Sequence, residues 1–211
     1  MPSPIYVTAA VEGPVDEAVV HKLIEHVGCV PGPVYGKKGK PALRSSIRGF
    51  NQAARRGPWI VLVDLDRDHE CAPPLREAWV PVAAPHLCFR VAVRAIEAWL
   101  IADDDALARF LRIARDRIPR APESLPDPKG ALVDLARASR QRAIREDMVP
   151  RGSSGRSVGP AYTSRVIEYV QREWRPEIAA ARADSLQRAI ACLNGLVEGP
   201  ASPRGKRDLF S

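Results

Sequence analysis

Carboxylate side chains follow three short apolar runs of the sequence, at or just after the point where each run ends. Carboxylates that lie close together repel one another, so such a cluster persists at neutral pH only if a hard divalent cation neutralises it. Magnesium prefers oxygen ligands, and a pair of such ions can activate a water and stabilise the leaving oxygen of a phosphodiester. The carboxylates are Glu12 after residues 5–11, Asp64 and Asp66 after residues 59–63, and Glu97 after residues 87–93.

Several of these acidic residues also have structural explanations. Glu12 precedes Gly-Pro and could be a solvated turn residue, whereas Asp16 suits the start of a helix, where negative charge is favourable. Glu97 lies on a mostly apolar helix start, so it is either paired with an arginine such as Arg94 or a ligand. Asp64 directly follows WIVLV and is therefore expected to be partly desolvated and to need a partner.

The three apolar runs predict strands of one parallel sheet. The run at residues 59–63 is continuous and rich in β-branched residues, which is typical of a strand covered on both faces. Helices are expected from about residue 16 to Gly28 and over residues 43–56, with a loop rich in Gly, Pro and Lys at residues 31–41. Ligands of open α/β sheets bind outside the carboxyl ends of the strands, so the carboxylates should converge on one rim.

The pattern of elements changes near residue 105. Alternating strands and helices predict an α/β domain over residues 1–105, with a mainly parallel sheet flanked by helices. Residues 106–198 are expected to form a helical C-terminal extension packed on it, and residues 199–211 a flexible basic tail. The C-terminal helices are expected at residues 106–113, capped by aspartates 103–105, at 128–139, capped by Asp127, at 162–174 and at 185–196.

The composition limits the class of protein. A chain of 211 residues, 45% hydrophobic and 27% charged, fits one sizeable globular domain and excludes disorder throughout. It has neither an apolar run long enough to span a membrane nor the regions of a signal peptide, so we expect a cytoplasmic protein. The cysteines lack metal-ligand spacing, and we expect buried, small apolar residues rather than disulfides or a zinc site: Cys29, Cys71, Cys88 and Cys192.

Positive charge is concentrated in one segment. The formal net charge is +7, and residues 26–63 contain no Asp or Glu but seven Lys or Arg. Such a one-sign segment indicates a polarised surface and favours a polyanionic partner, although an arginine-rich composition also arises from genome base bias.

Three motifs in order resemble a known fold. VEGPVDE at residues 11–17, DLDRD at 64–68 and RAIEAWLIAD at 94–103 resemble the TOPRIM fold. The chain is particularly similar to small stand-alone TOPRIM-like proteins related to the nuclease domain of OLD-family (overcoming lysogenization defect) proteins, including the DUF4276 group. TOPRIM proteins carry a Glu-Gly after the first strand and a DxD after a later one, which Glu12-Gly13 and Asp64-Leu65-Asp66 match.

The OLD-like branch carries two further residues. Its FExWLL-type segment is matched by Glu97-Ala98-Trp99-Leu100, and its downstream lysine has Lys129 as the best candidate. The resemblance implies that Glu12, Asp64, Asp66 and Glu97 bind one or two Mg²⁺ or Mn²⁺ ions. It gives Glu12, Asp64, Asp66 and Lys129 catalytic roles, and Glu12 could assist proton transfer.

The resemblance also implies a function and partners. The expected activity is a Mg²⁺-dependent nuclease, acting on DNA more than RNA and serving in defence against phage or plasmids. GPVYGKK at residues 32–38 is not a P-loop, so any ATPase would be a separate partner protein, and the chain could form a homodimer. The basic segment would contact the nucleic-acid backbone, unless its lysines are simply solvated, through Lys37, Lys38, Lys40, Arg44 and Arg48.

Two other functions remain open. IVLVDLDRD resembles the first motif of haloacid-dehalogenase-like phosphatases, with Asp64 as nucleophile and Asp66 as acid. That family places the motif on its first strand, whereas here a strand ending at Glu12 comes earlier, and Asp68 stands where that family has Thr, Ser or Val. A nucleic-acid-binding module with a purely structural acidic cluster would bind without divalent metal and would tolerate Asp64→Asn.

Overall fold

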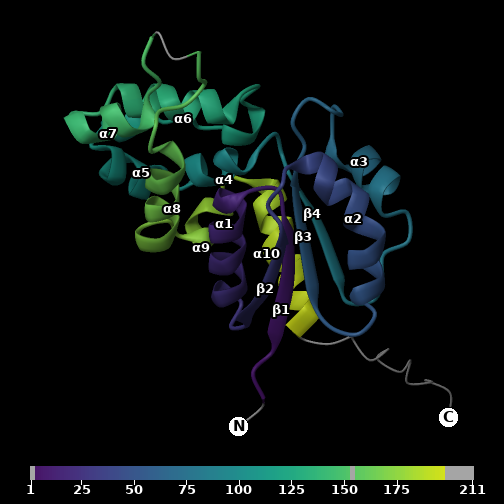
Figure 1. Cartoon of the computed structure of the whole chain (residues 1–211). Coiled ribbons are helices and arrows are strands. Elements are labelled where there is room, and N and C mark those ends of the chain that lie inside the picture. The colour runs from purple at the N-terminus through teal and green to yellow at the C-terminus, as the bar shows by residue number, and fades with distance from the viewer. Residues whose placement is uncertain (1–2, 153–154, 198–211) are drawn as a thin grey trace, which may run out of the picture.

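Four parallel strands form the sheet at the centre of the chain. The computed structural model describes residues 3–152 and 155–197 (Figure 1). The strand order is β2-β1-β3-β4, and every neighbouring pair is parallel. The expected α/β class is therefore confirmed. The strands are β1 (Tyr6–Val11), β2 (Val30–Gly36), β3 (Trp59–Asp64) and β4 (Leu87–Ala92).

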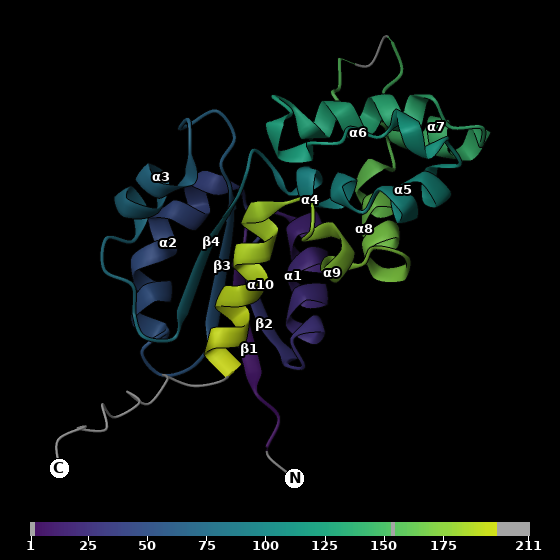
Figure 2. The same ribbon diagram turned by 180° about the vertical axis from the view of Figure 1, so that it is seen from behind.

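Helices cover both faces of this sheet. α1 (Pro14–His26) and α10 (Asp184–Val197) pack on one face, and α2 (Lys40–Ala53) and α3 (Ala72–Trp79) pack on the other (Figures 1 and 2). Successive residues of β3 alternate between the two cores, because side chains of a strand point to opposite faces in turn. Ile60 and Leu62 join the core under α1 and α10, while Val61 and Val63 join the core under α2 and α3.

The remaining helices follow β4 and pack beyond α1 (Figure 2). Their core residues belong to the same cluster as the α1 face of the sheet, so residues on both sides of position 105 share one core. Trp99 and Trp174 are buried there, and the Trp174 indole donates to the Trp99 carbonyl oxygen at 3.2 Å. The elements are α4 (Ile96–Ala102), α5 (Asp104–Leu111), α6 (Pro128–Arg137), α7 (Arg142–Met148), α8 (Tyr162–Arg172), α9 (Pro176–Ala179), and the 3-10 helices η1 (Arg115–Arg117) and η2 (Pro122–Ser124).

The sequence pattern anticipates most of these elements, including the caps at Asp103 and Asp127. Asp103 accepts a hydrogen bond from the Ala106 amide, and Asp127 accepts one from the Gly130 amide. Helices α7 and α9 are additional to those expected. The expected basic tail, residues 199–211, lies outside the described residues. Within the described part of the chain, no helix is long and apolar enough to cross a membrane.

The expected loop at residues 31–41 is wrong in its first half, because β2 occupies Val30–Gly36. Among the described strands β2 lies at the edge of the sheet and pairs with β1 alone, so its prolines remove no hydrogen bond that a second neighbour would need. Gly36 has φ +88°, and a Cβ at this position would collide with the Val11 carbonyl oxygen. A glycine is therefore required where β2 ends beside β1.

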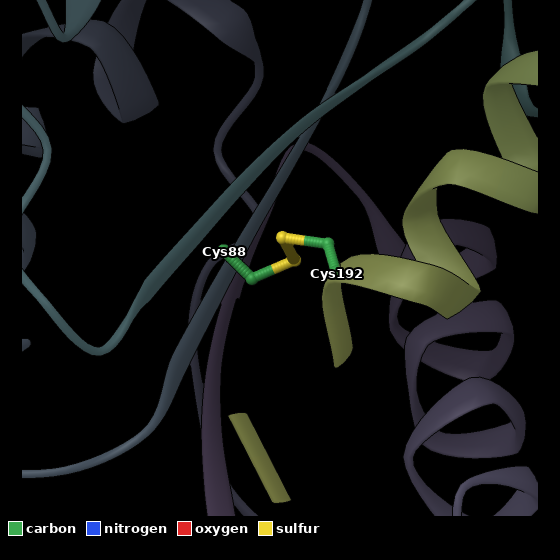
Figure 3. Close-up of a disulfide and its surroundings, with 2 residues drawn as sticks. All are labelled: Cys88 and Cys192. Atoms are coloured by element: carbon green, nitrogen blue, oxygen red, sulfur yellow. A yellow bond between two sulfur atoms is a disulfide. The ribbon is translucent and has the colours of Figure 1, made fainter. Parts of the chain in front are cut away.

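The expectation of four unpaired, buried cysteines is also wrong. Cys88 on β4 and Cys192 on α10 form a disulfide that ties the C-terminal helix to the sheet (Figure 3). Cys29 is buried as expected, whereas Cys71 is exposed. Sequence spacing could not indicate this pair because 104 positions separate its members and only the packing of α10 on the sheet brings them together.

Substituting Cys192→Ser should lower the free energy of unfolding of the oxidised protein by about 2–4 kcal/mol, because the crosslink closes a long loop in the unfolded chain. Denaturant unfolding with and without reductant measures this difference. Reductant should destabilise the native sequence and leave Cys192→Ser unchanged. A reductant effect of equal size in both proteins would contradict the assignment.

Candidate active site

The carboxyl ends of β1 and β3 meet at the point where the strand order reverses. The chain passes from β1 to β2 on one side and then returns to place β3 on the other side of β1. In open α/β sheets this crevice is where ligands bind. Glu12 is the first residue after β1 and Asp64 is the last residue of β3, so the fold places both at this crevice.

Backbone amides fix both of these carboxylates. The Asp64 amide donates to Oε1 of Glu12 at 2.9 Å, and the Ile96 amide, at the start of α4, donates to Oδ1 of Asp64 at 2.9 Å. The Gly39 amide also donates to the Glu12 carbonyl oxygen at 3.0 Å. The first two of these hydrogen bonds hold Oε1 of Glu12 and Oδ1 of Asp64.

Two further carboxylates are buried beside this pair. Asp16 on α1 is 8% exposed and Glu97 on α4 is 4% exposed. The Tyr162 hydroxyl donates to Oε1 of Glu97 at 3.1 Å, and Nζ of Lys129 lies 3.8 Å from the same oxygen. Glu97 is therefore not paired with Arg94, which instead donates to backbone carbonyl oxygens of the loop after β3, those of residues 66, 69 and 70.

The sequence position of Asp16 suggests a negative charge at the start of a helix, but in the structure Asp16 belongs to the buried carboxylate cluster. It lies on the buried stripe of α1 with Val19, Val20 and Leu23, and this helical spacing is the signal that could have placed it in the site. Tyr162 has no such signal, because α8 contributes it from 65 positions beyond Glu97.

Burial and mutual repulsion disfavour the charged forms of these acids. The pKa of Asp64 is raised well above its ordinary value by burial and then by the charges of Asp16, Glu97 and Glu12. Burial and the charges of Glu12 and Glu97 raise the pKa of Asp16 to about 7. Burial also raises the pKa of Glu12, although the hydrogen bond from the Asp64 amide opposes it. The cluster therefore gains free energy from any cation that neutralises it.

Lys40 of α2 provides one such positive charge at the outer edge of the cluster. Its Nζ donates to the Asp64 carbonyl oxygen at 2.5 Å and forms ion pairs with Asp66 at 2.9 Å and Asp68 at 2.7 Å. Burial alone would lower the pKa of Lys40, but the carboxylates of Asp68 and Asp66 outweigh it and raise that pKa. Asp66 has φ 52°, in the left-handed region that aspartate tolerates better than most residues.

The donor chemistry of the cluster suits a hard cation such as Mg²⁺ or Mn²⁺, since oxygen ligands with partial burial are what such ions prefer. Within residues 3–152 and 155–197, however, no three acidic, His or Cys side chains already stand in a geometry that could hold a metal ion. The cluster therefore suits such an ion by its charge and by its type of ligand atom. The structure brings together three of the four expected ligands, Glu12, Asp64 and Glu97, and adds Asp16 to them. The fourth, Asp66, contacts Lys40 instead.

The basic residues expected to contact nucleic acid lie on two elements next to the cluster. Lys37 and Lys38 belong to the loop after β2; both are exposed, and Lys37 pairs with Glu17 at 3.1 Å. Arg44 and Arg48 are exposed on α2, one and two turns beyond Lys40. Lys40 itself is half-buried and contacts the aspartates after β3, so it belongs to the site rather than to an open surface.

No known protein family, functionally characterised protein or solved structure matches this chain significantly.

Proposed function

We propose that this chain is a Mg²⁺-dependent nuclease that cleaves phosphodiester bonds with a TOPRIM-like site. The observation that carries the proposal is the cluster of Glu12, Asp16, Asp64 and Glu97 at the crevice between β1 and β3, where burial, together with charge repulsion, raises the pKa values of three of them. The ordered motifs support the same proposal. So do the basic side chains on α2 and in the loop after β2, which can contact phosphates.

The residues of the site would have different roles, which follow from their positions. Glu12, Asp16, Asp64 and Glu97 would hold one or two Mg²⁺ ions, and bound Mg²⁺ would supply an activated water and charge stabilisation for the leaving oxygen. Burial raises the pKa of Glu12, which makes this carboxylate a better proton acceptor than an exposed glutamate. Lys129 is half-exposed beside Glu97 and can contact a substrate phosphate from the α6 side.

The resemblance favours a role in defence against phage or plasmids, and we propose that the protein acts in the cytoplasm. The resemblance also favours DNA as substrate and leaves room for a separate ATPase partner protein and for a homodimer.

Supercoiled plasmid tests the proposal directly. The purified protein should nick or cut it with Mg²⁺ or Mn²⁺ and not with EDTA, and Glu12→Ala and Asp64→Ala should be inactive. Equal activity in all three proteins would defeat the nuclease assignment. Release of phosphate from small phosphomonoesters, lost in Asp64→Ala, would favour the phosphatase. Retardation of DNA in gels without metal or cleavage would favour the binding module.

Lys129→Met should reduce cleavage by about 10- to 100-fold and lower the free energy of unfolding by no more than about 1 kcal/mol, because Lys129 is half-exposed and lies 3.8 Å from the Glu97 carboxylate. Initial rates of plasmid nicking at saturating Mg²⁺ measure the effect. Lys22→Met on α1 is the matched control, since Lys22 donates a hydrogen bond to the Gln171 carbonyl oxygen and forms no ion pair within residues 3–152 and 155–197. A Lys129→Met rate equal to that of Lys22→Met would remove Lys129 from the catalytic set.

A further inference from the structure

A groove of about 900 Å³ opens next to the carboxylate cluster, between α2 and α3. Lys40 and Asp68, which contact each other at the edge of the site, form one end of its lining. Leu75 and Trp79 of α3 line its other side, and Arg44 of α2 lies across from them. The groove therefore leads from an aromatic side chain on α3 to the carboxylates.

Lys40 and Arg44 line the α2 side of the groove, and Arg48 continues their row of positive charge beyond the lining. Lys40, Arg44 and Arg48 are spaced four residues apart on α2, which places them on one face of the helix about 6 Å apart along its axis. Lys40 is committed to Asp66 and Asp68, but among the described residues Arg44 and Arg48 have no ion pair. These two guanidinium groups can contact successive phosphates of a nucleic-acid strand.

The other side of the groove supplies a flat surface. The Arg44 guanidinium lies over the Trp79 ring at 6.0 Å from its centroid, and Trp79 packs on Phe89 with ring centroids 6.0 Å apart. Trp79 is half-buried, so it is held by the core and still reaches the groove. Arginine and tryptophan planes are the surfaces on which unpaired bases stack, whereas the bases of a duplex are already stacked on each other.

We propose that this groove binds single-stranded nucleic acid, with one unpaired base stacked on Arg44 and Trp79 and the backbone following Arg44 and Arg48. The strand then passes Lys40 and presents a phosphodiester to the carboxylates. This inference rests on the proposed nuclease function and specifies its substrate as unpaired strand, which supercoiled plasmid also exposes locally. It also assigns Arg44 and Trp79 to substrate binding rather than to metal binding.

Binding without metal separates this inference from the nuclease proposal. A fluorescein-labelled twelve-residue oligothymidylate and a duplex of the same length are titrated with protein in EDTA, so that no cleavage occurs. The single strand should bind about tenfold more tightly than the duplex and quench tryptophan fluorescence. Trp99 and Trp174 are buried, which leaves the half-buried Trp79 and Trp59 as the source of the quenching. An acidic peptide, oligoglutamate, is the competitor.

Trp79→Leu and Arg44→Gln should each weaken single-strand binding about tenfold and change duplex binding little. Arg55→Gln is the matched control, because Arg55 is an exposed arginine just past the end of α2 that does not line the groove. Arg44 is also exposed, so Arg44→Gln tests the groove even if Trp79→Leu unfolds. Unchanged single-strand affinity in Arg44→Gln, equal affinity for duplex, or displacement by oligoglutamate at equal charge concentration would each overturn the inference. Tight single-strand binding by a protein that never cleaves would instead defeat the nuclease proposal alone.

Discussion

Replacement of Asp64 by asparagine is expected to abolish metal-dependent cleavage, by about a thousandfold or more, and to make the metal-free protein more stable. The amide oxygen of asparagine can still accept the Ile96 amide hydrogen bond, so the shape of the crevice is preserved. The substitution removes an ionisable group whose charged form is disfavoured by burial and by four neighbouring carboxylates. A rise in the thermal midpoint of about 3 °C or more in EDTA would correspond to at least 1 kcal/mol for a chain of this size.

The matched control for this prediction is Asp134→Asn. Asp134 is an exposed aspartate on α6 whose nearest ion pair is a 3.7 Å contact with Arg137, so its neutralisation should change neither cleavage nor stability. Thermal unfolding in EDTA and in Mg²⁺ reports on both variants. Native Asp64 protein should be stabilised by Mg²⁺, and Asp64→Asn much less. A less stable Asp64→Asn protein that still cleaves would contradict the site.

The sheet could be predicted from the sequence where each strand carries its own local signal. β3 is buried on both faces and therefore appears as the uninterrupted run WIVLV, and β1 and β4 are similar. β2 contains Pro31 and Pro33 and is half-exposed, because an edge strand needs neither a full set of amide donors nor two buried faces. A strand of this kind has the composition of a loop.

Some residues of the site could likewise be predicted from local sequence, whereas others depend on contacts between distant segments. Glu12 and Asp64 could be placed because a carboxylate next to a strand end has its position fixed by that strand, and the parallel order brings the two ends together. Tyr162 and the Cys88–Cys192 disulfide depend on how α8 and α10 fold back over the preceding elements. No pattern within a short window of sequence carries that information.

The metal-free protein should lose stability as the pH rises from about 4 to about 7, which is the opposite of what ordinary ion-paired carboxylates cause. The pKa of Asp16 is raised in the folded protein from 3.8 to about 7, so between these values the folded state binds more protons than the unfolded state. Stability therefore falls with pH through this window and levels off above it. The difference between the two pKa values corresponds to about 4 kcal/mol, and saturating Mg²⁺ should offset much of it.

Asp16→Asn tests whether this loss comes from the cluster. Urea unfolding in EDTA at several pH values between about 4 and 8 gives the slope, and the variant should be markedly flatter. Some slope should remain, since Asp64 and Glu12 also have raised pKa values, but it should be smaller because the Asp16 charge is itself one cause of the raised Asp64 pKa. Protons and Mg²⁺ compete for the same oxygens, so cleavage by the native protein should decline as the pH falls below about 7. If stability in EDTA is independent of pH across this window, these carboxylates do not share one buried cluster, and the physical case for a cation among them fails.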